Sequence, residues 1–97
     1  MNEKINIHIA KEKLKARKLK KSVWWNNKLQ GGECYYCRQV FAASELTMDH
    51  IVPLSRGGFS KKGNLAVCCF DCNQKKRNLT PVEWSEYIQS RLNNEQS

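Results

Sequence analysis

Two pairs of cysteines with the spacing Cys-x-x-Cys constrain the fold of this chain more than any other feature. Cys34 and Cys37 form the first pair, Cys69 and Cys72 form the second, and 31 residues lie between the pairs. Two intervening residues allow both thiolates of a pair to face one ion, and two such pairs supply the tetrahedral four-sulfur site that zinc favours. Because four protein ligands leave no coordination position open, we expect this zinc to be structural.

A structural metal suits a chain of this length. The 97 residues can form one domain with a small apolar core, so metal binding is expected to contribute to folding. Two redox-active motifs are the alternative interpretation, but no βαβ pattern of the thioredoxin type accompanies them. Cys68 is expected to be a small buried side chain, because only Cys69 lies three residues before Cys72. An exchange of Cys68 and Cys69 as ligands is the alternative at that position.

The charge of the chain favours nucleic acid as a partner. Lys and Arg number 17 against 9 Asp and Glu, for a net charge of +8, and nine of the basic residues lie within residues 1–28. Such a balance favours nucleic acid first and an anionic membrane surface second. No apolar run approaches the roughly 20 residues that span a bilayer, and the first residues lack the pattern of a secretory signal. We therefore expect a cytoplasmic protein with reduced thiols and no membrane partner.

Composition divides the chain into three segments. Residues 1–32 form a basic N-terminal extension, in which one amphipathic helix is expected over residues 9–29. Residues 33–78 carry the cysteines, glycines and short β-prone runs and form the expected core. Residues 79–97 are expected to form a helix that packs on this core, starting from the capping box of Thr80.

The core segment alternates between strand and helix patterns. We expect short strands near residues 47–51 and 64–67, a polar loop over residues 56–63, and a helix from residue 69 or 70 to 77. The fold class is therefore small α+β.

Four polar side chains of the core segment have properties suited to catalysis. His50 can act as a general base, because its unperturbed pKa of about 6.5 lets it accept a proton at neutral pH. Asp49 offers a hard oxygen for Mg²⁺ or Mn²⁺. Asn73 directly follows a zinc ligand, which would hold it rigidly, and the side chain of Asn64 could orient the ring of His50. Each residue alone has a simpler explanation in a turn, a loop or a solvated helix, and their combination with the cysteine pairs favours a catalytic site.

Asp49 and His50 are adjacent on a predicted strand, which restricts how they can share a site. Adjacent residues of a regular strand point to opposite faces of the sheet. Asp49 and His50 can therefore share a site only where the strand twists, bends or ends, and Pro53 makes a strand end plausible.

The order of these motifs closely resembles that of the HNH nucleases. The resemblance covers residues 33–77 and rests on the two cysteine pairs, the run from Asp49 to Leu54, the glycines 57 and 58, Asn64-Leu65, and Asn73 with Lys76. It implies a zinc-stabilised ββα-metal core of the treble-clef type, flanked here by the basic N-terminal helix and the C-terminal helix.

The resemblance also implies a metal-dependent endonuclease with double-stranded DNA as the expected substrate. His50 would be the general base, Asn64 would orient His50, and Asn73 together with Asp49 would hold the catalytic cation. Because Asn is a weaker ligand than His for softer metals, Asn73 favours Mg²⁺ or Mn²⁺ over zinc at this site. The leaving group would be the 3′ oxygen, so that the product carries a 5′-phosphate.

Contacts with nucleic acid are expected from both the motif and the N-terminal helix. By the resemblance, Lys76 is expected to contact a phosphate, as is nearby Arg77. A solvated face is the alternative for the helix lysines. The expected contacts are Arg56, Lys76, Arg77, Lys11, Lys15, Lys18 and Lys21. Trp24 and Trp25 are compatible with base stacking, with core packing or with self-association.

Two other functions are compatible with the same residues. A non-catalytic nucleic-acid-binding zinc module needs the charge and the cysteines, but it leaves Asp49, His50 and Asn73 unexplained. An accessory component of phage packaging or of restriction is compatible with an HNH core.

Overall fold

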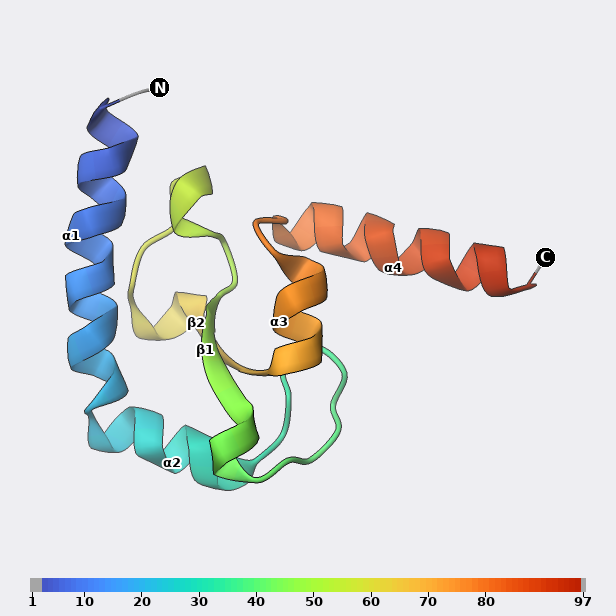
Figure 1. Ribbon diagram of the computed structural model, residues 1–97, viewed down its shortest axis with the longest axis horizontal. Coiled ribbons are helices and arrows are strands. Elements are labelled where there is room, and N and C mark those ends of the chain that lie inside the picture. The colour runs from blue at the N-terminus through green and yellow to red at the C-terminus, as the bar shows by residue number, and fades with distance from the viewer. Residues whose placement is uncertain (1–2, 97) are drawn as a thin grey trace.

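A two-stranded antiparallel sheet followed at once by a helix forms the centre of the molecule (Figure 1). The computed structural model describes residues 3–96. Strand β1 (Leu46–His50) pairs with β2 (Leu65–Cys69), and helix α3 (Phe70–Lys76) starts directly after β2. This order and the small α+β class confirm the prediction.

Residues 51–64 form the loop that connects β1 to β2 and reverses the direction of the chain. Gly58 lies so close to the backbone that an added Cβ would stand 1.8 Å from the carbonyl oxygen of Val52, so only glycine fits there. Gly57 adopts a φ of +90°, a conformation that also favours glycine. The tight approach holds the loop against the end of β1.

The N-terminal segment forms two helices, so the prediction of one helix over residues 9–29 was wrong. Helix α1 (Glu3–Lys20) ends two residues before Ser22, and helix α2 (Val23–Gly31) begins directly after it. The hydroxyl of Ser22 donates to the Leu19 carbonyl at 2.6 Å and accepts from the Trp25 backbone N–H at 3.2 Å. Ser22 is thus the N-cap of α2, and the turn brings Trp25 into the core, where it is 4% exposed.

Helix α1 packs against the loop that follows β1. Its buried side is formed by Glu12 and Ala16, and His8 lies 2.6 Å from the carbonyl oxygen of Gly58. Figure 1 shows α1 standing beside this loop, with α2 crossing below the hairpin.

The apolar core surrounds the cysteines. Its buried members are joined by partly buried apolar side chains of α2, of the segment before β1 and of β1 itself. The buried members are Trp25, Cys34, Leu46, Val67, Cys68, Cys69 and Cys72. The core is small, as the length of the chain predicts.

Helix α4 (Pro81–Gln96) begins with the predicted cap. The Thr80 N–H donates to Glu83 at 2.9 Å, and the Glu83 N–H donates to the Thr80 hydroxyl at 3.4 Å. Trp84 contacts Tyr36 with ring centroids 5.4 Å apart, whereas Ile88 is 38% exposed. Beyond its first turns, α4 extends away from the sheet (Figure 1). None of the described helices is both long and apolar enough to cross a membrane.

Candidate active site

The structure brings together the four cysteines that the sequence pairs predict as zinc ligands. The sulfur atoms of Cys34, Cys37, Cys69 and Cys72 all lie within 4.8 Å of one another. A zinc ion with Zn–S bonds of about 2.3 Å places its sulfurs about 3.8 Å apart, so a modest contraction of the cluster accommodates the ion. Cys68 lies outside the cluster and is fully buried, which confirms its prediction as a core residue.

The position of the cluster follows from the chain around it. Cys34 and Cys37 lie in a knuckle closed by an isolated bridge between Glu33 and Val40. Cys69 ends β2 and is the N-cap of α3, and Cys72 lies in the first turn of that helix. A bound zinc would therefore join the knuckle to the junction of sheet and helix.

Backbone donors favour a thiolate at one member of this cluster, Cys34. Burial alone would raise the pKa of Cys34, but backbone N–H groups of Cys37, Cys69 and Tyr36 donate to its sulfur and lower its pKa to about 7. A thiolate is the form that binds zinc.

Asp49 is joined to the cysteine knuckle through Tyr36 and is held through one of its two oxygens. Its side chain is buried, and the Tyr36 hydroxyl and the Lys76 ammonium both contact its Oδ2 atom, the latter at 3.2 Å. Within the described chain no group binds Oδ1, so one oxygen of Asp49 stays available for a cation. Burial, followed by the hydrogen bond to Asp49, raises the pKa of Tyr36 and keeps it a neutral donor.

The placement of Lys76 differs from the phosphate contact that the resemblance implies. The side chain of Lys76 is 0% exposed, and its ammonium also donates to the His50 carbonyl at 3.1 Å. A side chain enclosed in this way cannot reach a phosphate at the surface. Lys76 instead binds the end of β1, where it joins the Asp49 carboxylate to the His50 carbonyl.

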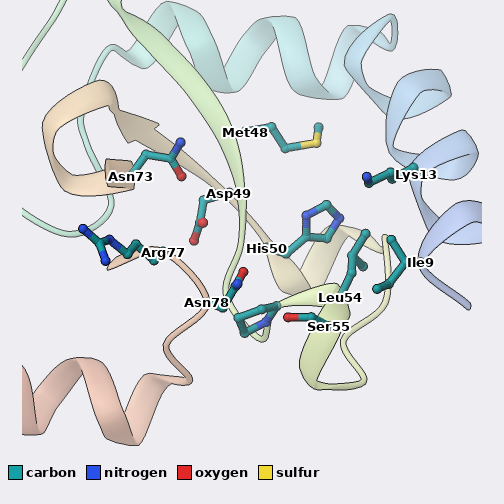
Figure 2. Close-up of a pocket in the computed structure, with 11 residues that line it drawn as sticks. Ile9, Lys13, Met48, Asp49, His50, Leu54, Ser55, Asn73, Arg77 and Asn78 are labelled. Carbon is teal, nitrogen blue, oxygen red and sulfur yellow. The ribbon is translucent and has the colours of Figure 1, made fainter. Parts of the chain in front are cut away.

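Asp49, His50 and Asn73 line one open cavity of about 380 Å³ (Figure 2). Figure 2 shows Asp49 on the side of β1 that faces Asn73 and Arg77, and His50 on the side that faces α1. The two neighbours therefore do point to different sides, as strand geometry requires, but β1 ends at His50 and the cavity reaches both. The side chain of Asn73 makes no hydrogen bond within the described residues, and so its amide oxygen is available as a ligand.

The ring of His50 is half-buried at the other side of this cavity. Its Nε2 atom lies 2.8 Å from the hydroxyl of Ser60. Burial lowers the pKa of His50, although the nearby charge of Asp49 opposes this effect. A lowered pKa keeps the imidazole neutral and able to accept a proton at neutral pH.

The side-chain hydrogen bonds of Asn64 go to the loop between the strands and not to His50, which differs from its expected role. Its Oδ1 accepts from the Val52 N–H at 2.8 Å, and its Nδ2 donates to the carbonyls of Val52 and Phe59 at 3.0 and 2.9 Å. Asn64 thus closes the loop between the strands. The partner of the His50 ring, Ser60, lies on this same loop.

The cations of α1 lie along two edges of the helix. We define the inner edge as Lys13, Arg17 and Lys20, and the outer edge as Lys11, Lys15 and Lys18. The inner edge lines a second cavity of about 340 Å³, which shares Lys13 and His50 with the first. Figure 2 shows Lys13 reaching from α1 toward His50.

The N-terminal lysines that the sequence analysis predicted as nucleic-acid contacts lie outside both cavities. None of Lys11, Lys15, Lys18 and Lys21 lines either cavity, and Lys15 pairs with Glu12 at 3.1 Å. Spacing alone predicted a basic helix but could not identify the edge that faces His50.

The two arginines near the motif have different surroundings. Arg77 is exposed and lines the cavity beside Asp49, as a nucleic-acid contact requires. Arg56 donates through both terminal nitrogens to the carboxylate of Glu83, at 2.8 and 3.3 Å. This bidentate pair engages the charge of Arg56 and joins the loop after β1 to α4.

Three residues of the site were not identified from the sequence. Tyr36 holds Asp49, Ser60 contacts His50, and Glu12 binds Ser60 from α1. Glu12 offered a signal, since no other acidic residue lies between Glu3 and Glu33 in this Lys-rich segment. Tyr36 and Ser60 offered none, because their partners are distant in the sequence.

Comparison with known proteins agrees with this geometry. A family model described as HNH endonuclease matches residues 34–86, more than half of the chain. The chain belongs to the HNH endonuclease family. It is also 36% identical, over 58 residues, to the CRISPR-associated endonuclease Cas9 of Corynebacterium diphtheriae. This similarity covers 59% of the present chain and only 5% of that relative.

Membership of the HNH family confirms the resemblance drawn from the motifs. Helices α1 and α2 both precede the matched residues. The inner edge and Glu12 are therefore features of this chain that the family match does not cover.

We predict that Cys37→Ser releases the bound zinc and lowers the melting temperature, because a structural site loses one of its four ligands. Cys68→Ala is the matched control, since it removes a buried cysteine outside the cluster. Zinc content per chain and melting by circular dichroism check the prediction. Equal zinc content and equal melting temperatures in Cys37→Ser and wild type would contradict a four-cysteine structural site.

Proposed function

We propose that this protein hydrolyses phosphodiester bonds of DNA in a reaction that depends on a divalent cation. The observation that supports this proposal is the common cavity of Asp49, His50 and Asn73, in a member of the HNH endonuclease family. Lys13 and Arg77 also line this cavity. A cavity with a carboxylate, an imidazole and two cations suits a phosphodiester in both charge and chemistry.

The donor set fits a hard cation. Asp49 Oδ1 and the amide oxygen of Asn73 are the oxygen ligands that Mg²⁺ and Mn²⁺ prefer, and such ions complete their coordination with water and phosphate oxygens. When bound there, the cation supplies charge stabilisation for the phosphate oxygens and for the departing oxygen. Zinc is held separately by the softer thiolates.

The protein's own groups position and deprotonate the attacking water. His50 accepts the proton from this water, for which a lowered pKa and a neutral ring are suitable. Lys76 and Tyr36 hold Oδ2 of Asp49 so that its other oxygen faces the cavity. Lys76 therefore acts as a positioning residue in this proposal and makes no phosphate contact.

The inner edge of α1 is proposed to bind phosphates that flank the cut. Within the described chain none of its three cations has an acidic partner, and all three are exposed beside the cavity that contains His50. A helix rises about 1.5 Å per residue, so Lys13 and Lys20 span about 10 Å along the helix axis. This length corresponds to more than one nucleotide of a strand.

Cleavage of supercoiled plasmid by the zinc-loaded protein tests the proposed activity. We expect nicked or linear DNA with 5′-phosphate ends when Mg²⁺ or Mn²⁺ is added, and about 10²- to 10⁴-fold slower cleavage by His50→Ala, since a general base contributes that much. Wild-type rates in His50→Ala would exclude His50 as the base. Binding of DNA without cleavage at any metal would identify a non-catalytic module.

A pair of triple variants with equal charge tests the DNA surface. Lys13, Arg17 and Lys20 are changed together to Gln in one variant, and Lys11, Lys15 and Lys18 in the other, so that each variant carries three fewer charges. We expect the slope of log K against log salt to fall by roughly 0.9 for each phosphate that the inner-edge variant no longer neutralises. The outer-edge variant should keep most of the wild-type slope. Equal slopes in the two variants would show that α1 contributes only general charge.

A further inference from the structure

The ring of His50 is connected to helix α1 by a chain of hydrogen bonds through the inter-strand loop. His50 Nε2 lies 2.8 Å from the Ser60 hydroxyl, and that hydroxyl lies 2.5 Å from the backbone carbonyl of Glu12. The Ser60 backbone N–H also donates to the Glu12 carboxylate at 2.6 Å. Ser60 is 6% exposed and Glu12 is 2% exposed, so water does not replace these bonds.

The chemistry of these groups sets the direction of each hydrogen bond. A backbone carbonyl can only accept, so the single hydroxyl proton of Ser60 is donated to Glu12. The hydroxyl oxygen must then accept from the other neighbour, and His50 Nε2 carries the proton that is donated. In a neutral imidazole only one nitrogen is protonated, which leaves Nδ1 with a free electron pair.

Glu12 is a charged residue buried on the inner side of α1, and its burial has to be compensated. A buried carboxylate destabilises a protein unless hydrogen bonds and an opposite charge compensate it. Both are present here, because Ser60 donates to one oxygen and the Lys15 ammonium lies 3.1 Å from the other. The Ser60 N–H, more than any other group, lowers the pKa of Glu12 and keeps it ionised. An alanine at this position would pack against the loop without this requirement.

We infer that Glu12 and Ser60 are positioning residues that fix the His50 ring as its Nε2–H tautomer and reserve Nδ1 for the proton of the attacking water. The role of Nδ1 rests on the proposed function, whereas the tautomer does not. Helix α1 would then complete the general base of a site whose Asp49, His50 and Asn73 all belong to the family-matched segment. Ser60, although within that segment, depends on Glu12 for its hydroxyl orientation.

Long-range ¹H–¹⁵N NMR of the histidine rings tests the tautomer without any nuclease activity. The chain has two histidines, so comparison with His50→Ala assigns the His50 signals. In zinc-loaded wild type near pH 8, we expect His50 to be predominantly the Nε2–H tautomer. Ser60→Ala should shift His50 toward a mixture of the two tautomers, and Ser60→Thr, which keeps the hydroxyl, should restore the wild-type pattern. A predominant Nδ1–H tautomer in wild type, or an unchanged tautomer in Ser60→Ala, would overturn the inference.

Plasmid cleavage supplies the second measurement. Removal of such an orienting hydrogen bond commonly reduces activity by about 10- to 100-fold, and we expect this reduction in kcat of Ser60→Ala with KM nearly unchanged. Glu12→Ala removes the carboxylate that holds the Ser60 backbone N–H against α1, and it should shift the tautomer in the same direction as Ser60→Ala by loosening the contact of the hydroxyl with the carbonyl of residue 12. Ser85→Ala, an exposed serine of α4, is the control that should match wild type in both measurements.

The two proposals can fail separately. A wild-type protein with the expected tautomer but no cleavage would refute the proposed activity and support the hydrogen-bond chain. A wild-type protein that cleaves DNA while His50 carries its proton on Nδ1 would support the activity and refute the positioning roles.

Discussion

Four cysteine sulfurs within 4.8 Å of one another are the constraint on which the rest of this small structure depends. Thiolates so close together repel one another strongly, and a divalent cation bound between them removes that repulsion. Because the ligands come from the knuckle and from the β2–α3 junction, a metal there joins two parts of the chain. The apolar core packs around these same residues, and Asn73 is placed by its neighbour Cys72.

A second constraint comes from the buried polar groups around Asp49. Within the described residues, no buried side-chain nitrogen or oxygen lacks a hydrogen-bond partner. Lys76 and Tyr36 satisfy one oxygen of Asp49. Asp49 Oδ1 and the amide of Asn73 are left unengaged within the described chain, and both residues line the cavity. The buried contacts thus leave two hard oxygens available in one place, separate from the soft donors of the zinc cluster.

The parts that could be predicted from the sequence are those governed by local spacing. The Cys-x-x-Cys pairs predicted the cluster, and the alternation of apolar runs and turns predicted the two strands and α3 nearly to the residue. The cap at Thr80 was also correct, because its partner Glu83 lies only three residues away. In each case the interacting groups are close in sequence or belong to a recurrent motif.

The features that were wrongly predicted or missed from the sequence share one physical reason: each depends on tertiary contacts. The break at Ser22 contains no Gly or Pro, and the burial of Trp25 in the core is what favours it. The burial of Lys76 against a residue 27 positions earlier in the chain cannot be deduced from its helix. Glu12 and Ser60 are separated by 48 residues, so only the folded structure shows their contact.

The division between a soft structural site and a hard catalytic site is the central claim, and Mn²⁺ binding tests it most directly. Electron paramagnetic resonance of the zinc-loaded protein, with DNA present, should report one tightly bound Mn²⁺ per chain while the zinc content stays constant. Asn73→Ala should weaken Mn²⁺ binding without loss of zinc, since its side chain makes no hydrogen bond within the described residues. Mn²⁺ that displaces zinc, or that binds Asn73→Ala as tightly as wild type, would contradict the account.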